Sequence, residues 1–109
     1  MTTTDMDAMD LMETFKITKI ESRWTVGGRW VTGTIGGYGF EALVFPEHAQ
    51  CADYELADSR ISKLWVQQVS GGATVASFDR GWDIHPTTPS AQQIVELLAE
   101  GLAEFVYAE

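Results

Sequence analysis

Three groups of polar residues in this sequence have types and spacings that could carry chemistry. The first is His48 and Cys51, whose H-x-x-C spacing suggests a pair of zinc ligands and whose residue types suggest a Cys–His nucleophile. A structural zinc site takes four ligands, but the sequence has no second cysteine and its other histidine, His85, is remote. A nucleophile would need an orienting group and an oxyanion hole, which no motif marks. We therefore expect an ordinary surface loop here, without a metal ion.

The second group is Asp79, Arg80 and Asp83. These residues could be catalytic. However, an arginine flanked by two acids at a strand end is more typical of a paired, hydrogen-bonded network. We expect a non-catalytic protein without a cofactor, and a small enzyme using this cluster or His48 and Cys51 is the alternative.

The third group is Glu96, Glu100 and Glu104, which recur every fourth residue and so share one face of a helix. Like charges at this spacing repel slightly, and no lysine offsets them. The pattern is typical of a solvated helix face. It also fits an acidic surface that docks on a basic partner.

A β-sheet must position these groups, and paired glycines indicate its turns. Gly-Gly supplies the positive φ angles of two-residue hairpins, so Gly27-Gly28 and Gly36-Gly37 should flank a strand over 29–35. Strands over 15–26 and 38–45 complete a meander. The expected partners are Trp24 opposite Val31, Ile20 opposite Ile35, Ile35 opposite Tyr38, Gly33 opposite Phe40 and Val31 opposite Ala42.

A second hairpin, with strands over 61–69 and 73–84, should turn at Gly71-Gly72. Its simplest register places Trp65 opposite Phe78, Ile61 opposite Trp82 and Lys63 opposite Arg80. The last pair is unfavourable, so either Asp79 or Asp83 intervenes or a bulge shifts the register.

A helix should follow, with Thr88 as N-cap, Pro89 at its first position and its end near Val106. The apolar face should include Ile94, Leu98, Gly101 and Phe105, with Gly101 allowing the helix close to the sheet. The fold class is therefore α+β: a mainly antiparallel meander of about five strands with one C-terminal helix on a face. Residues 1–13 are an acidic, methionine-rich tail expected to be flexible, and 14–109 form one domain.

One helix covers only one face of such a sheet. On the other face Trp30, Leu43 and Phe45 gather at one end, and an exposed apolar patch there would mark a protein interface or a homodimer contact.

The composition limits the partners. The 109 residues carry a net charge of −9, which argues against binding nucleic acid through a basic face but allows attraction to a basic protein surface. No apolar run reaches the length of a membrane span, and the acidic N-terminus does not resemble a secretory signal. A single cysteine fits a reducing setting, so we expect a cytoplasmic protein.

Two segments resemble a pattern in small proteins of phages and mobile elements. Residues 60–64 (RISKL) and 78–83 (FDRGWD) match an "RISKL"-like and a "YDRGWD"-like strand, with Phe78 in place of the tyrosine. The resemblance implies a mobile-element source, in which small acidic proteins often block host defences such as CRISPR nucleases.

The sequence therefore predicts an acidic binding protein of the anti-CRISPR type that docks on the basic, nucleic-acid-binding surface of a host complex. Its binding residues would be Glu96, Glu100, Glu104, Trp30, Leu43 and Phe45. A structural or accessory phage protein acting as a homodimer is the alternative binding role.

Overall fold

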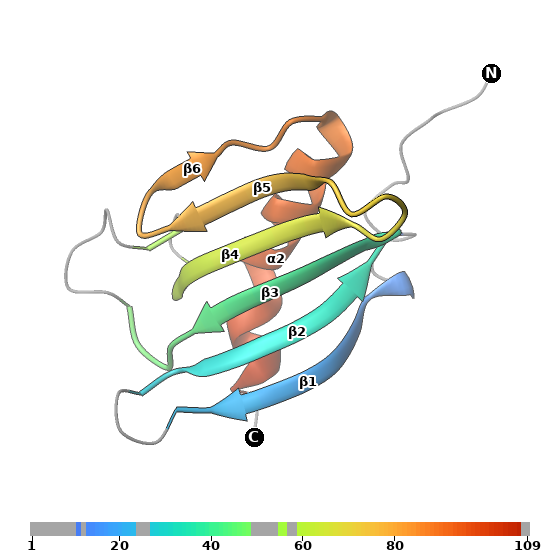
Figure 1. The fold of residues 1–109 in the computed structure, drawn as a ribbon. Coiled ribbons are helices and arrows are strands. Elements are labelled where there is room, and N and C mark those ends of the chain that lie inside the picture. Colours follow the sequence, from blue (N-terminus) through green and yellow to red (C-terminus); the bar gives the residue numbers. More distant parts are fainter. Residues whose placement is uncertain (1–10, 12, 24–26, 49–54, 57–58, 108–109) are drawn as a thin grey trace.

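The computed structural model describes residues 11, 13–23, 27–48, 55–56 and 59–107. They form one antiparallel sheet in chain order, crossed on one face by a helix, which confirms the α+β class (Figure 1). The elements are β1 (Lys16–Ser22), β2 (Arg29–Ile35), β3 (Tyr38–Val44), β4 (Ile61–Gln68), β5 (Thr74–Asp79), β6 (Trp82–Ile84) and α2 (Pro89–Val106).

The β2–β3 hairpin has the predicted register. Ile35 pairs with Tyr38, Gly33 with Phe40 and Val31 with Ala42. Gly36 and Gly37 have φ angles of 58° and 83°, the left-handed conformation that a tight hairpin turn requires. Val31, Ile35, Phe40 and Ala42 are fully or almost fully buried beneath α2, so this hairpin provides the centre of the core.

The predicted pairing of β1 with β2 is wrong by four residues. Ile20 lies opposite Val31, not Ile35, and β1 ends at Ser22 instead of continuing to residue 26. Trp24 falls outside the described residues. The connection is longer than two residues: the Arg23 N–H donates to Gly28 O at 3.0 Å, and the Gly27 N–H donates to Arg23 O at 3.0 Å. The glycines do adopt positive φ angles, but they close a wider loop, which removes Arg23 from the sheet.

The β4–β5 hairpin is shifted by one residue from the simple prediction. The predicted two-residue turn is wrong: the Gln68 N–H donates to Ala73 O at 2.8 Å, so the connection spans residues 69–72 and Gln67 pairs with Thr74, two residues off the simple register. A bulge between Val66 and Gln67 reduces this offset to one residue, so Phe78 pairs with Leu64 instead of Trp65. A shift of one residue exchanges the two faces of a strand. Leu64 is therefore buried, whereas Trp65 is 40% exposed on the face away from α2.

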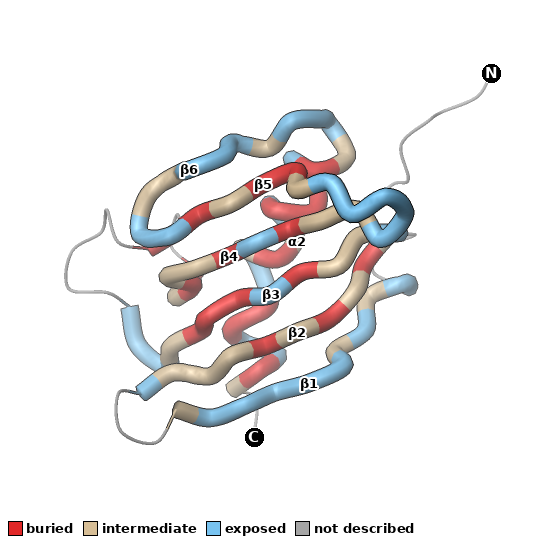
Figure 2. Tube along the Cα trace, in the orientation of Figure 1, coloured by how far each residue is buried: buried red, intermediate tan, exposed pale blue. Residues whose placement is uncertain are grey.

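The predicted strand over 73–84 is two strands, which is why the sheet has six strands and not five. The chain turns at Arg80 and Gly81, with φ angles of 54° and 143°, and the Asp79 N–H donates to Gly81 O at 2.8 Å. Trp82 consequently pairs with Phe78 and not with Ile61. Figure 2 shows that the two edge strands, β1 and β6, are largely exposed.

Helix α2 begins as predicted: Thr88 is the N-cap, its Oγ1 accepts the Ala91 N–H at 3.1 Å, and Pro89 follows. The predicted role of Gly101 is wrong. Gly101 is exposed, and no atom lies within 4 Å of the place its Cβ would take. Phe105 is also 58% exposed, while Ala91 and Ala103 are the small residues on the buried face. The contact face of the helix is thus rotated from the predicted one.

Both ends of the described chain are fastened to the sheet. Leu11, from the segment predicted to be a tail, is 3% exposed in the core, and Thr14 Oγ1 links Leu11 O to the Gly36 N–H, at 2.7 Å each. At the other end, Tyr107 donates its hydroxyl to Val44 O at 2.8 Å. Burial raises the pKa of the Tyr107 phenol, even though Arg29 and Arg60 lower it, so the hydroxyl keeps its proton for this bond.

Candidate functional site

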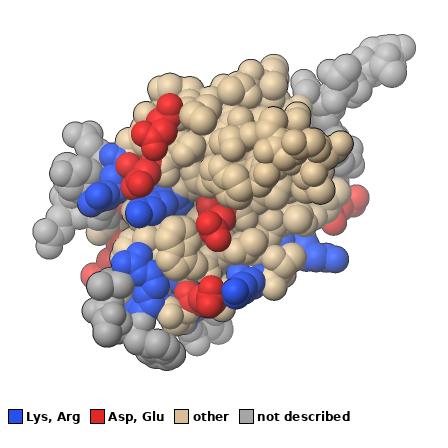
Figure 3. Space-filling model, in the orientation of Figure 1, with Lys and Arg blue, Asp and Glu red and all other residues tan. Residues whose placement is uncertain are grey.

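A cavity of about 630 Å³ lies at the end of the sheet where β3 ends and β4 begins. Its lining comes from the ends of β3 and β4, the loops on either side of them and the β5–β6 turn. Four of the seven lysines and arginines of the chain line it, namely Arg23, Arg60, Lys63 and Arg80. We call it the cationic cavity. Figure 3 shows Lys and Arg side chains gathered at this end of the uncovered sheet face, with Asp and Glu side chains beside them.

The position of the cavity follows from a row of cross-strand partners. Trp30, Leu43, Lys63 and Asp79 are successive partners across β2, β3, β4 and β5. The side chains of direct partners lie on the same face of the sheet, and this row lies on the face that α2 does not cover. The row therefore changes from apolar to charged between Leu43 and Lys63, and the cavity lies over that boundary.

The apolar wall of the cavity is formed by Leu43 and Phe45. Leu43 is 2% exposed, and a Cβ on Gly28 would lie 3.0 Å from a ring carbon of Phe45 and 3.3 Å from Leu43 Cδ1. The loop backbone at Gly28 thus covers both side chains. The expected exposed patch of Trp30, Leu43 and Phe45 is therefore not an open surface: Leu43 is buried and, with Phe45, lines the cavity, and Trp30 lies outside the lining.

The cationic wall of the cavity consists of Lys63 and Arg80, and both form long ion pairs with Asp79. Lys63 Nζ and Arg80 Nε each lie 3.8 Å from Asp79 Oδ1, and all three side chains are between 39% and 61% exposed. Exposed pairs of this kind contribute about 0–1 kcal/mol. An incoming anion therefore displaces or shares Asp79 at small cost. The predicted clash of Lys63 with Arg80 is resolved because Asp79 is the partner of Lys63.

The backbone of the cavity lining adopts an uncommon conformation. Among the described residues, Arg60 and Arg80 are the two non-glycine residues with a positive φ, at 64° and 54°. Each is fixed by a neighbouring strand: Arg60 O accepts the Phe45 N–H at 2.9 Å, and the Arg80 N–H donates to Ser62 O at 3.0 Å. Bulky residues with positive φ are rare and concentrate at functional sites. Both arginines line the cationic cavity.

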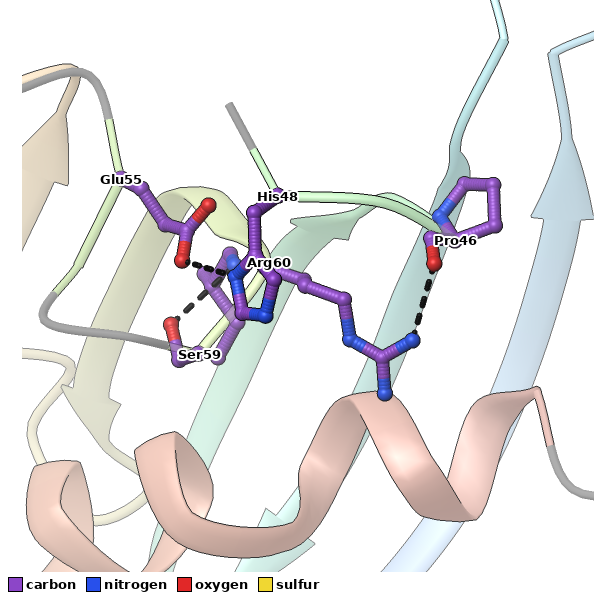
Figure 4. Close-up of polar contacts among 6 residues, drawn as sticks. Pro46, His48, Glu55, Ser59 and Arg60 are labelled. Atoms are coloured by element: carbon purple, nitrogen blue, oxygen red, sulfur yellow. Dashed lines mark hydrogen bonds and ion pairs between the residues drawn. The ribbon is translucent and has the colours of Figure 1, made fainter. Parts of the chain in front are cut away.

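His48 and Glu55 form the remaining polar side of the cavity (Figure 4). The Glu55 side chain is 5% exposed, and its Oε2 lies 2.7 Å from His48 Nδ1. A buried carboxylate requires such a partner. The Arg60 guanidinium donates to Pro46 O at 2.9 Å. This hydrogen bond holds the Arg60 side chain against the segment that contains Pro46 and His48. Cys51 lies outside the described residues, and within the described part of the chain no three His, Cys, Asp or Glu side chains are grouped to hold a metal ion.

The residues that the sequence singled out do not form one site. Glu96, Glu100 and Glu104 are exposed on α2, on the other side of the sheet from Leu43 and Phe45. Glu100 and Glu104 line a smaller cavity of about 210 Å³ together with His48 and Arg60, so the acidic helix face does have a cation beside it. Asp83 lies exposed on β6.

Among the basic residues of the cavity, the sequence pattern does not identify Arg23, Arg60 or Lys63 as site residues. The pattern predicts Arg23 on a strand, and the longer loop moves it to the cavity. The simple register predicts Lys63 opposite Arg80. A signal was present, because the register conflict already required either a carboxylate beside Lys63 or a bulge, and the hairpin contains both.

One family model, described as a domain of unknown function, matches this chain. The model of the domain of unknown function DUF7678 matches residues 29–103, and the chain belongs to that family. The matched segment contains β2 to β6, nearly all of α2, and every cavity residue except Arg23, Gly27 and Gly28. No curated protein and no solved structure matches the chain. Among the described residues, no helix is both long and apolar enough to cross a membrane.

Proposed function

We propose that this chain is a non-catalytic binding protein and that the cationic cavity holds an anionic group of its ligand. The observation that carries the proposal is the convergence of four of seven basic residues on one cavity, in a chain with a net charge of −9. Scattered cations would only offset neighbouring acids. Cations collected in a concave site focus their potential on it and attract anions.

The apolar wall strengthens this effect. Leu43 and Phe45 exclude water from one side of the cavity, which lowers the local dielectric response. Charge-assisted hydrogen bonds formed there are stronger than those on an open surface. The contacts that Lys63 and Arg80 make with Asp79 are long and exposed, so an anion competes with Asp79 at little cost.

Removing the cationic wall is expected to abolish most anion binding. In a calorimetric or NMR titration with inorganic phosphate at low salt, the double variant Lys63→Gln/Arg80→Gln should bind at least about tenfold more weakly than the wild type, because two charge-assisted hydrogen bonds are lost. The matched control is Lys16→Gln/Lys19→Gln, which removes the same charge from exposed positions of β1 outside the cavity.

The control should bind phosphate within about twofold of the wild type, because Lys16 and Lys19 do not line the cavity and act on the anion only through bulk solvent. A wild type that shows no saturable binding, or a control that weakens as much as the cavity variant, would overturn the proposal.

A second candidate function is inhibition, in which the acidic face of α2 docks on the basic nucleic-acid-binding surface of a host defence complex. It is favoured by the exposure of Glu96, Glu100 and Glu104 along the outer face of the helix. Of these, Glu96 accepts a hydrogen bond from Gln92 at 2.9 Å, which leaves its charge in place. The resemblance of two strands to mobile-element proteins agrees with this role, and the inhibitor would not bind nucleic acid itself.

Charge reversal of the helix face should abolish inhibition. When the chain is expressed in cells that carry an active CRISPR system, survival of a targeted plasmid should rise. The variant Glu96→Lys/Glu100→Lys/Glu104→Lys should return survival to background, because docking now meets like charges. The triple variant Glu13→Lys/Glu21→Lys/Glu41→Lys makes the same charge change at exposed sites elsewhere. Equal loss in both triples would show a net-charge effect and count against a helix interface.

A further inference from the structure

We propose that the ligand of the cationic cavity is a phosphomonoester that carries an aromatic ring, with the phosphate on Lys63 and Arg80 and the ring on the half-buried Phe45. This inference rests on the proposed function and specifies its ligand. It is drawn from the arrangement of two chemically different walls within one cavity.

The two walls lie side by side. Leu43 and Lys63 are direct partners on adjacent strands, so their Cβ atoms are about 5 Å apart. A ligand that satisfies both walls must carry its charge and its apolar part within a few bonds of each other. An aryl phosphate or a nucleotide-like molecule has this form, whereas a bare anion satisfies only one wall.

The volume of the cavity points to the same class. The cavity volume is about 630 Å³, many times the roughly 10–15 Å³ that one bound water needs on the same measure. An inorganic anion would fill a small part of that space. Sites for small organic ligands occupy about 300–1,000 Å³ and combine apolar walls with a few polar groups.

The charges place the anion at one side. Glu47 and Glu55 line the cavity near His48, and they repel an anion there. Lys63 and Arg80 lie together beyond the apolar wall, and Ser62 lines the cavity between Arg60 and Lys63. Lysine, arginine and serine together offer donors in several directions. A phosphate, with three acceptor oxygens and a charge near −2, matches this set better than a planar carboxylate.

The apolar wall, which contains Phe45, is best suited to contact an aromatic ring of the ligand. Phe45 is half-buried, and its ring lies against the backbone at Gly28. Aromatic rings bind one another through faces and edges, and a guanidinium group can cover a ring. Arg23 lines the cavity beside Gly27 and Gly28, where it can take that position once a ring is bound.

Three probes test the assignment on the full chain: 1-naphthyl phosphate, inorganic phosphate and citrate. We expect 1-naphthyl phosphate to bind at least about tenfold more tightly than either other anion, because it alone engages both walls. Phe45→Ala should weaken naphthyl phosphate by about tenfold and inorganic phosphate by clearly less, because the bare anion loses only the exclusion of water by the ring. Lys63→Gln/Arg80→Gln should weaken both. Phe45→Leu keeps the apolar volume without the ring, and it replaces Phe45→Ala if the alanine variant does not fold.

Each other outcome is decisive. If naphthyl phosphate binds no more tightly than inorganic phosphate while Lys63→Gln/Arg80→Gln weakens both, the ring is wrong and the anion-binding function stands. Equal weakening of both phosphates by Phe45→Ala also removes the ring from the assignment. If citrate binds as tightly as naphthyl phosphate, the assignment of the anionic group as a phosphate is wrong. If the wild type shows saturable binding of none of the three probes, both the assigned ligand and the proposed anion-binding function are wrong.

Discussion

Replacing Gly33 by alanine is expected to lower the free energy of unfolding by about 2–4 kcal/mol. A Cβ on Gly33 would lie 2.8 Å from Phe40 Cζ and would overlap the carbonyl oxygen of Lys16. The first neighbour is a 2% exposed ring that is stacked on Phe15, and the second is the backbone of β1. Neither can move without loosening the pairing of β1 with β2.

Urea denaturation followed by fluorescence of the tryptophans measures this effect. Gly39→Ala is the matched control, since Gly39 lies on the adjacent strand and its Cβ would meet only one atom, at 3.9 Å. The control should change the unfolding free energy by less than about 0.5 kcal/mol. Equal stability of the two variants would show that β1 is not seated as the structure has it.

Replacing Leu11 by alanine is the second large effect, an expected loss of about 2–4 kcal/mol. Leu11 is 3% exposed and belongs to the same core cluster as Ile94 of α2. Its side chain also contacts Gly36, in the β2–β3 turn. Truncation leaves a cavity among residues that are themselves held by the sheet and the helix, so little of it can be refilled.

Thermal and urea unfolding of Leu11→Ala should be compared with Glu13→Ala, which removes an exposed side chain two residues later. The control should remain within about 0.5 kcal/mol of the wild type. If Leu11→Ala is equally silent, the domain begins at residue 14 as the sequence alone predicted. A loss of the expected size extends the folded unit into the segment that was predicted to be a tail.

The two hairpins that contain β2 show which parts of the strand register can be predicted from the sequence and which cannot. At Gly36-Gly37 the tight turn and the alternation of Val31, Gly33 and Ile35 give the same register, and the prediction is confirmed. At Gly27-Gly28 the glycines have the expected backbone conformation but close a longer loop. A glycine pair reports a local conformation, and it does not report how many residues the turn contains.

The helix shows the same limit. Thr88 and Pro89 identify its start through local hydrogen bonding and a fixed φ, and the structure agrees. The buried face depends on the twisted sheet below it. Gly101 and Phe105 are therefore exposed where the period alone placed them inside, and Ala103 is buried instead.

By itself the sequence determined the fold class, the β2–β3 register, the helix and its cap, and the acidic face of α2, because each follows from local geometry and periodicity. Only the tertiary structure decided the site. The cationic cavity joins Arg23, Leu43, Lys63 and Arg80, which come from four different segments of the chain. Their proximity depends on a bulge in β4–β5, a longer β1–β2 loop and a turn at Arg80-Gly81. Such irregularities are set by competition between neighbouring strands for hydrogen bonds and burial, and no single segment contains that information.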